Sequence, residues 1–129
     1  MSVSTPSVTR TLQVGELALE TVAMGEGPVF LVLHGFEPLA PDAPFLAALG
    51  NAGRVVAPSH PGFGRCDRPE DFDSIYDLTH LYLEVLDLLA EDVEDVTLVG
   101  LSFGGWLACE MMVKRQAPVA RLFLVDSLG

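Results

Sequence analysis

From residue 29 onward, short apolar runs alternate along the chain with segments that have helical spacing. Four such runs predict strands. The run Val29–Leu33 is apolar throughout, which is typical of a central strand covered on both faces of a sheet. The four runs are Val29–Leu33, Arg54–Pro58, the run that begins at Val96, and Arg121–Val125. Strands of this kind, separated by helices, are typical of a parallel sheet in an α/β fold.

Two helices are predicted before the third of these strands. Residues 45–49 form a short helical segment that Gly50 is expected to close, since glycine favours the position after a helix. A longer amphipathic helix is expected to end near Ala90, and Ser74 with Asp77 has the spacing of a capping box at its start. Its apolar stripe at helical spacing is Ile75, Leu78, Tyr82, Val85 and Leu89.

The beginning of the chain predicts a different arrangement. Thr9–Val14 and Leu17–Val22 flank a turn at Gly15 and predict an antiparallel hairpin. The strands and helices that follow predict right-handed crossovers. We therefore expect one domain over residues 1–129, of the α/β class: a mainly parallel sheet with helices on both faces and an N-terminal antiparallel hairpin.

The sharpest local signal is Gly100-Leu101-Ser102-Phe103-Gly104, which joins the strand from Val96 directly to a helix predicted over 103–115. Such a turn forces Ser102 into a sparsely allowed backbone region and requires small neighbours. The serine hydroxyl would then lie at a helix N-terminus, where free N–H groups favour negative charge. The alternative is a tight glycine turn in which Ser102 is a bystander.

Further polar residues follow the other predicted strands. They are His34-Gly35-Phe36, Ser59-His60-Pro61 and Asp126. Because reactive groups in parallel sheets gather at the carboxyl ends of the strands, we expect these residues near Ser102.

Three motifs agree in order and spacing with the α/β-hydrolase family, which the chain resembles from about Thr9 onward. They are His34-Gly35-Phe36, Pro61-Gly62-Phe63-Gly64 and Gly100-Leu101-Ser102-Phe103-Gly104-Gly105. The resemblance implies that Ser102 is a nucleophile and that the backbone N–H groups of Phe36 and Phe103 form an oxyanion hole. It also implies that His34 and Gly35 contact the substrate. The expected activity is hydrolysis of a carboxylic ester or related carbonyl compound through an acyl-enzyme, with no metal and no cofactor.

The chain departs from the family pattern after Ser102. Family members place the catalytic acid and histidine on later strands, so this chain resembles an amino-terminal half, a core truncated after the sixth strand and without a lid. The histidines here, His34, His60 and His80, all precede Ser102. His34 is expected to orient the oxyanion loop and His60 to brace the following turn, although each of the three is a candidate base. Asp126 is a candidate acid, or a strand-end carboxylate bound by backbone N–H groups.

Composition narrows the functional classes. Half of the residues are hydrophobic, which predicts a packed core rather than disorder. A net charge of −11 argues against binding to nucleic acid and indicates a solvated acidic surface. The polar start and the lack of long apolar runs predict a cytoplasmic protein without membrane contact. Cys66 and Cys109 form neither a disulfide framework nor a metal-ligand cluster.

The last predicted strand, Arg121–Val125, is apolar at four successive positions and has no later strand to pair with. Such an edge exposes unpaired backbone groups beside an apolar surface, which natural proteins normally cover. We therefore expect a second chain or a second copy on this strand, besides a small-molecule substrate. The alternative function is a non-catalytic binding or interaction protein that retains the fold.

Overall fold

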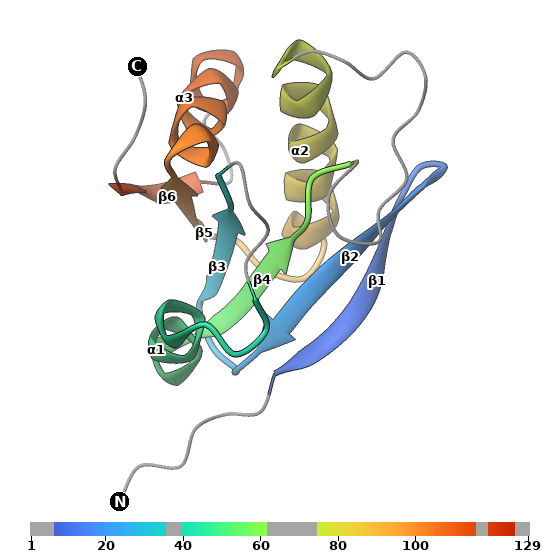
Figure 1. Ribbon diagram of the computed structural model, residues 1–129. Helices are drawn as coiled ribbons and strands as arrows, with labels where there is room; N and C mark the ends of the chain where they lie inside the picture. The colour runs from blue at the N-terminus through green and yellow to red at the C-terminus, as the bar shows by residue number, and fades with distance from the viewer. Residues whose placement is uncertain (1–6, 36–39, 62–74, 116–118, 126–129) are drawn as a thin grey trace, which may run out of the picture.

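The computed structural model describes residues 7–35, 40–61, 75–115 and 119–125. These residues form strands and helices in the predicted order (Figure 1). The strands are β1 Val8–Val14, β2 Leu17–Met24, β3 Val29–Leu33, β4 Arg54–Pro58, β5 Val96–Leu101 and β6 Val119–Val125. The helices are α1 Pro44–Ala52, α2 Ile75–Ala90 and α3 Phe103–Lys114.

The strands form a single sheet in the order β1-β2-β4-β3-β5-β6. β1 and β2 pair as the predicted hairpin, and β2 joins the rest of the sheet through antiparallel pairing with β4. The pairs β4–β3, β3–β5 and β5–β6 are parallel. The mainly parallel sheet with an N-terminal hairpin is thus confirmed, and the parallel strands bring their carboxyl ends to one edge.

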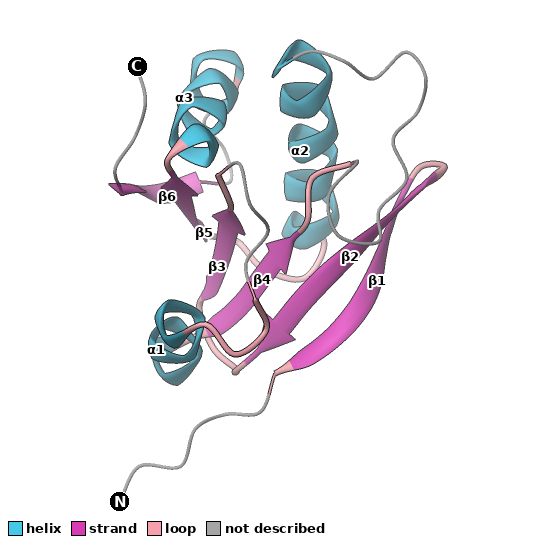
Figure 2. Cartoon of the chain, viewed as in Figure 1, coloured by secondary structure: helices cyan, strands magenta, loops and turns pink. Residues whose placement is uncertain are grey.

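Helices cover both faces of this sheet, as predicted (Figure 2). Side chains of α2 and α3 pack with Leu31 and Leu98 in the larger core cluster. Val32 and Val99, the next residues along β3 and β5, point to the other face and pack with α1. This alternation into two cores explains why β3 is apolar throughout, since its side chains meet covered faces on both sides of the sheet.

Helix α1 differs from the expectation that Gly50 ends it. It continues through Gly50 to Ala52, and the backbone N–H of Gly53 donates to the Leu49 carbonyl at 2.9 Å. A Cβ on Gly50 would lie 2.8 Å from Met24 Cγ, so this glycine allows α1 to approach β2 closely. Glycine at a packing contact and glycine at a helix end look alike in sequence. The proposed capping residue Ser74 lies outside the described residues.

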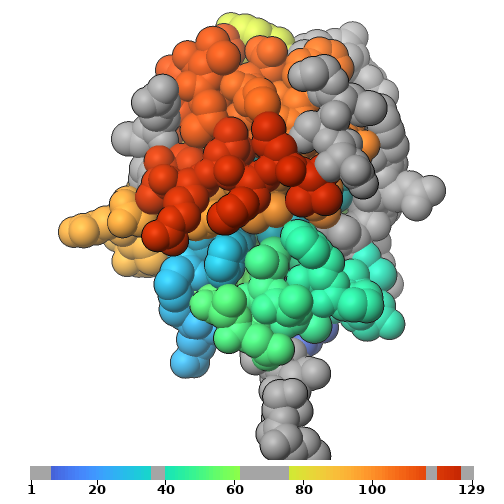
Figure 3. Space-filling model, turned by 90° about the vertical axis from the view of Figure 1, so that its left-hand side faces the viewer, coloured from blue at the N-terminus to red at the C-terminus, as the bar shows by residue number. Residues whose placement is uncertain are grey.

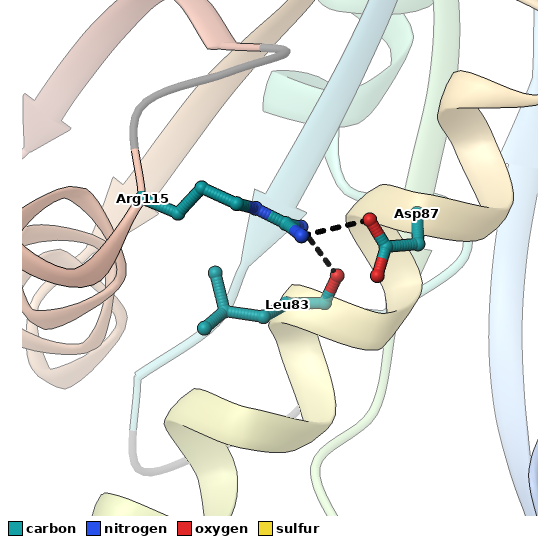
Figure 4. A network of polar contacts seen from close by, with 3 residues as sticks. All are labelled: Leu83, Asp87 and Arg115. Atoms are coloured by element: carbon teal, nitrogen blue, oxygen red, sulfur yellow. Dashed lines mark hydrogen bonds and ion pairs between the residues drawn. The ribbon is translucent and has the colours of Figure 1, made fainter.

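Arg115 follows α3 and ties it to α2 (Figure 4). Its Nη1 lies 2.8 Å from Asp87 Oδ1, and its Nη2 donates to the Leu83 carbonyl at 2.8 Å. An exposed ion pair contributes at most about 1 kcal/mol. The buried apolar contacts therefore dominate this helix pair, and Arg115 fixes how the two helices meet. No helix in the described part of the chain has the length and apolar character needed to cross a membrane.

Strand β6 is one of the two edges of the sheet, opposite β1, and it is exposed. Figure 3 shows it in red, open at the surface between α3 and α1. Phe123 is 52% exposed, and its apolar neighbours Leu122, Leu124 and Val125 are exposed as well. Among the described residues, nothing pairs with the outer side of β6.

Candidate active site

Ser102 has the strained backbone that the sequence predicts. It lies between β5 and α3 with φ 54° and ψ −119°, and it has the one positive φ of any non-glycine residue in the described ranges. Holding such a conformation costs about 1–3 kcal/mol, so the surrounding structure must enforce it. The backbone geometry predicted for a nucleophile is confirmed.

Close backbone contacts around Ser102 provide that enforcement. A Cβ on Gly104 would lie far inside van der Waals contact with the Leu33 carbonyl oxygen, and one on Gly100 would overlap Gly105. The first turn of α3 is therefore pressed against the ends of β3 and β5. The Ser102 N–H donates to the Val125 carbonyl of β6 at 2.8 Å. Three strands thus fix the start of α3.

The end of β3 lies directly against the serine. A Cβ on Gly35 would be 3.0 Å from Ser102 Cβ and 3.4 Å from its Oγ. This places the start of the predicted oxyanion loop beside the hydroxyl. Phe36 and Asp126 lie outside the described residues, so their roles stay predictions, as does the role of the Phe103 N–H at the first position of α3.

His34 and His60 form a buried pair with their rings 3.7 Å apart, and both side chains are at most 1% exposed. The His60 N–H donates to His34 Nε2 at 2.9 Å, and the His34 Nδ1 donates to the Gly35 carbonyl at 2.8 Å. Carbonyl oxygens only accept, so the geometry assigns His34 as the tautomer protonated on Nδ1. Both ring nitrogens of His34 are thus engaged within the protein, and substrate contact by His34 and Gly35 stays a prediction.

His60 is the opposite tautomer. Its Nε2 donates to the His34 carbonyl at 2.8 Å, which leaves Nδ1 to accept from the Tyr82 hydroxyl at 2.7 Å. Burial, followed by the neighbouring His34, lowers the pKa of His60 from 6.5 to about 3, while the hydrogen bond with the His34 backbone partly opposes this. His60 is therefore neutral at pH 7.

None of the histidines that the structure describes is hydrogen-bonded to Ser102. His80 lies in a groove with the β1–β2 turn, its ring 4.3 Å from that of Tyr76. A base for Ser102 is therefore not assigned within the described ranges. These ranges also contain no group of three His, Cys, Asp or Glu residues able to hold a metal. The absence of a cofactor stays a prediction.

A hollow of about 710 Å³ lies away from Ser102, and Arg10, Met24 and Arg54 are among the residues that line it. Met24 is at the carboxyl end of β2 and Arg54 at the amino end of β4. This position is the opposite end of β4 from His60. The hollow therefore belongs to a different part of the molecule from the candidate active site.

Tyr82 is a site residue that the sequence pattern does not reveal, since it falls in the apolar stripe of α2. Tyr82 is fully buried and its hydroxyl meets His60. A signal was available, since tyrosine in a buried stripe needs a polar partner for its hydroxyl. Which residue supplies that partner depends on how α2 is oriented against β4.

Comparisons with known proteins agree with this geometry. The model of the alpha/beta hydrolase family matches residues 30–129. The 2-hydroxymuconate semialdehyde hydrolase of Pseudomonas putida is 36% identical over 110 residues, which are 81% of this chain and 38% of that protein. Epoxide hydrolase A of Mycobacterium tuberculosis is 34% identical over 122 residues, 88% of this chain and 37% of that protein. The chain thus spans less than half the length of these relatives.

Solved structures likewise match most of this chain and less than half of their own chains. The 2-hydroxy-6-oxo-6-phenylhexa-2,4-dienoate hydrolase from Rhodococcus sp. strain RHA1 superposes with a TM-score of 0.81 and 25% identity, covering 97% of this chain and 48% of that one. A meta-cleavage product hydrolase from Pseudomonas fluorescens IP01 gives a TM-score of 0.79 and 28% identity, covering 93% of this chain and 45% of that one. Family model, relatives and fold agree: the chain belongs to the alpha/beta hydrolase family.

Proposed function

We propose that this chain is the nucleophile-bearing part of a serine hydrolase that acts on a carboxylic ester or related carbonyl compound. The observation that carries the proposal is the strained Ser102 between β5 and α3. Strain of this kind persists only where the structure enforces it. The strained turn presents the hydroxyl at the N-terminus of α3. A bystander serine in a relaxed turn would need no such enforcement.

The chemistry of the elbow residue supports a carbonyl substrate. Relatives of this chain include a semialdehyde hydrolase and an epoxide hydrolase. A serine hydroxyl is suited to acyl transfer, because its ester with the acyl group is readily hydrolysed by water. Family members that open epoxides have aspartate at the elbow, whereas this chain has Ser102.

In the proposed reaction, Ser102 Oγ attacks the carbonyl carbon while a base removes its proton. The oxygen of the tetrahedral intermediate accepts hydrogen bonds from the N–H groups of Phe36 and Phe103. The leaving group departs with a proton, and water then hydrolyses the acyl-enzyme. Asp126 is the candidate acid of this chain, and no base for Ser102 is assigned among the described residues.

We expect the isolated 129 residues to hydrolyse p-nitrophenyl acetate only weakly. An oxyanion hole without a complete triad leaves an acceleration of about 10³–10⁴ over water, whereas loss of the triad costs about 10⁶ in kcat in a well-studied protease. The measurement compares the wild type with Ser102→Ala. The weak activity of the wild type should fall to the background rate in Ser102→Ala.

Free thiols also attack activated esters, so Cys109→Ser and Cys66→Ser are the matched controls. Both should retain the Ser102-dependent rate. Loss of activity in the cysteine variants, with Ser102→Ala unchanged, would contradict a nucleophilic serine and favour the binding-protein alternative. Rapid turnover that Ser102→Ala abolishes would instead show that this chain or a second copy supplies the base.

We further propose that β6 is covered by a second chain or a second copy. In a purified sample a second copy is the available occupant, so we expect self-association. The net charge of −11 opposes it only at long range, since salt screens charges within about 10 Å at 0.1 M. Size-exclusion chromatography with light scattering at 0.3 M NaCl measures the mass.

The variant Phe123→Glu should shift the protein toward monomer, because a charge would be buried against the apolar edge. Val113→Glu is the control, since Val113 is 83% exposed on α3. A monodisperse wild-type species of 13.8 kDa with cooperative unfolding would overturn the prediction.

A further inference from the structure

A chain of hydrogen bonds connects the middle of α2 to the residue beside the nucleophile. It runs from the Tyr82 hydroxyl to His60 Nδ1, then from His60 Nε2 to the His34 carbonyl. A second connection between the histidines runs from the His60 N–H to His34 Nε2, and His34 Nδ1 donates to the Gly35 carbonyl. Two adjacent residues at the end of β3 thus have their carbonyl groups held by imidazole rings.

The His34 carbonyl fixes the direction of these bonds. Because a carbonyl only accepts, the proton of the neutral His60 ring is on Nε2, and Nδ1 accepts from the Tyr82 hydroxyl. Tyr82 and both histidines are at most 1% exposed, so water does not replace a lost partner easily. The rings of His60 and Phe103 also meet, with centroids 6.0 Å apart, which places the pair against the first residue of α3.

The backbone held in this way lies against the candidate active site. Gly35 is in contact with Ser102 on one side, and Gly104 is packed against the Leu33 and His34 carbonyl groups on the other. A shift of the β3 end would therefore move either the serine or the first turn of α3. Packing resists movement of this backbone into Ser102 and Gly104, and the hydrogen bonds of His60 hold the His34 carbonyl and ring in place.

We propose that Tyr82 and His60 are positioning residues that hold the His34–Gly35 backbone against Ser102. They act through His34 and do not touch the reacting atoms. The inference rests on the proposed function for its catalytic consequence, but the positioning itself is measured without activity.

The first test uses the unmodified chain. Long-range ¹H–¹⁵N correlation spectra report which nitrogen of each histidine ring carries the proton. We expect opposite tautomers, with the proton on Nε2 of His60 and on Nδ1 of His34. His60 protonated on Nδ1 would overturn the proposal, and this measurement requires no variant to fold.

The second test compares Tyr82→Phe with Tyr76→Phe, which removes the same hydroxyl from the exposed face of the same helix. Losing a buried hydrogen bond should speed amide exchange of His60 about tenfold in Tyr82→Phe. Amide shifts of Gly35 and Ser102 should change with it. In Tyr76→Phe all of these signals should keep their wild-type values. Changes in Tyr82→Phe that stop at His60 and leave Gly35 and Ser102 unaltered would overturn the proposal.

Ester hydrolysis separates this inference from the proposed function. Where Ser102-dependent hydrolysis is present, Tyr82→Phe should lower kcat about tenfold with KM unchanged, because the oxyanion is stabilised in the transition state rather than in the bound substrate. A rise in KM with constant kcat would contradict positioning. If Ser102→Ala shows no Ser102-dependent hydrolysis while the spectra behave as expected, the proposed function fails and the positioning stands.

Discussion

Replacing Gly104 by alanine should strongly destabilise the fold. The added Cβ would overlap the backbone carbonyl oxygens of Leu33 and His34, which belong to the buried end of β3 and cannot rotate away as a side chain would. We expect a loss of more than about 4 kcal/mol of unfolding free energy, a large part of the stability of a typical domain. Urea denaturation followed by circular dichroism measures it.

Gly15→Ala is the matched control. Gly15 has φ 58°, so alanine there is strained, but its Cβ would meet no closer atom than Glu84 Oε2 at 4.0 Å. Backbone strain without a clash costs about 1–2 kcal/mol. If Gly104→Ala were as stable as Gly15→Ala, α3 would not be pressed against β3 as described.

Lowering the pH below 6.5 should destabilise the protein through His60. In the unfolded chain His60 binds a proton at its ordinary pKa of 6.5, whereas burial and the neighbouring His34 lower the pKa in the fold to about 3. The stabilising contribution is therefore complete above pH 6.5 and is lost as the pH falls toward 3. The slope is about 1.4 kcal/mol per pH unit, so about 2 kcal/mol is lost between pH 6.5 and pH 5.

The measurement is the unfolding free energy from urea titrations between pH 5 and 8, a range in which ordinary carboxylates stay ionised. Among the residues that the structure describes, His34 after β3, Tyr82 from α2 and Phe103 from α3 face the His60 ring. His60→Gln should flatten the acid slope, whereas His80→Gln, at an exposed position, should leave it as in the wild type. An equal slope in the wild type and His60→Gln would show that His60 is not the group responsible.

The strands were the most predictable part of the fold. The bounds predicted for Val29–Leu33 and Arg54–Pro58 are those that the structure gives, because buried strand positions leave a short apolar run in the sequence. The prediction that Gly50 ends a helix was wrong. A glycine is needed there because Met24 of β2 leaves no room for a side chain. The sequence shows that a position is small, but the partner that requires it belongs to the folded sheet.

The candidate site likewise has one part that the sequence predicts and one part that only the fold determines. The geometry of Ser102 could be predicted because a strand, five residues and a helix in one stretch determine it. The contact of Tyr82 with His60 joins residues 22 positions apart and depends on the rotation of α2 about its axis. A histidine motif therefore predicts where a site lies, and the fold determines which nitrogen of each imidazole ring carries the proton.

The hydrogen bond from the Ser102 N–H to the Val125 carbonyl has a thermodynamic consequence. It connects the nucleophile directly to the strand whose outer side is open. A ligand of Ser102 that shifts β6 through this bond would change the affinity of the β6 edge for the second chain or copy proposed above. Linkage makes this reciprocal: occupation of the edge changes the affinity of the serine for its ligand by the same factor. The proposed occupant of β6 and a ligand of Ser102 would thus be thermodynamically linked, and Val125 is the residue through which each would act on the other.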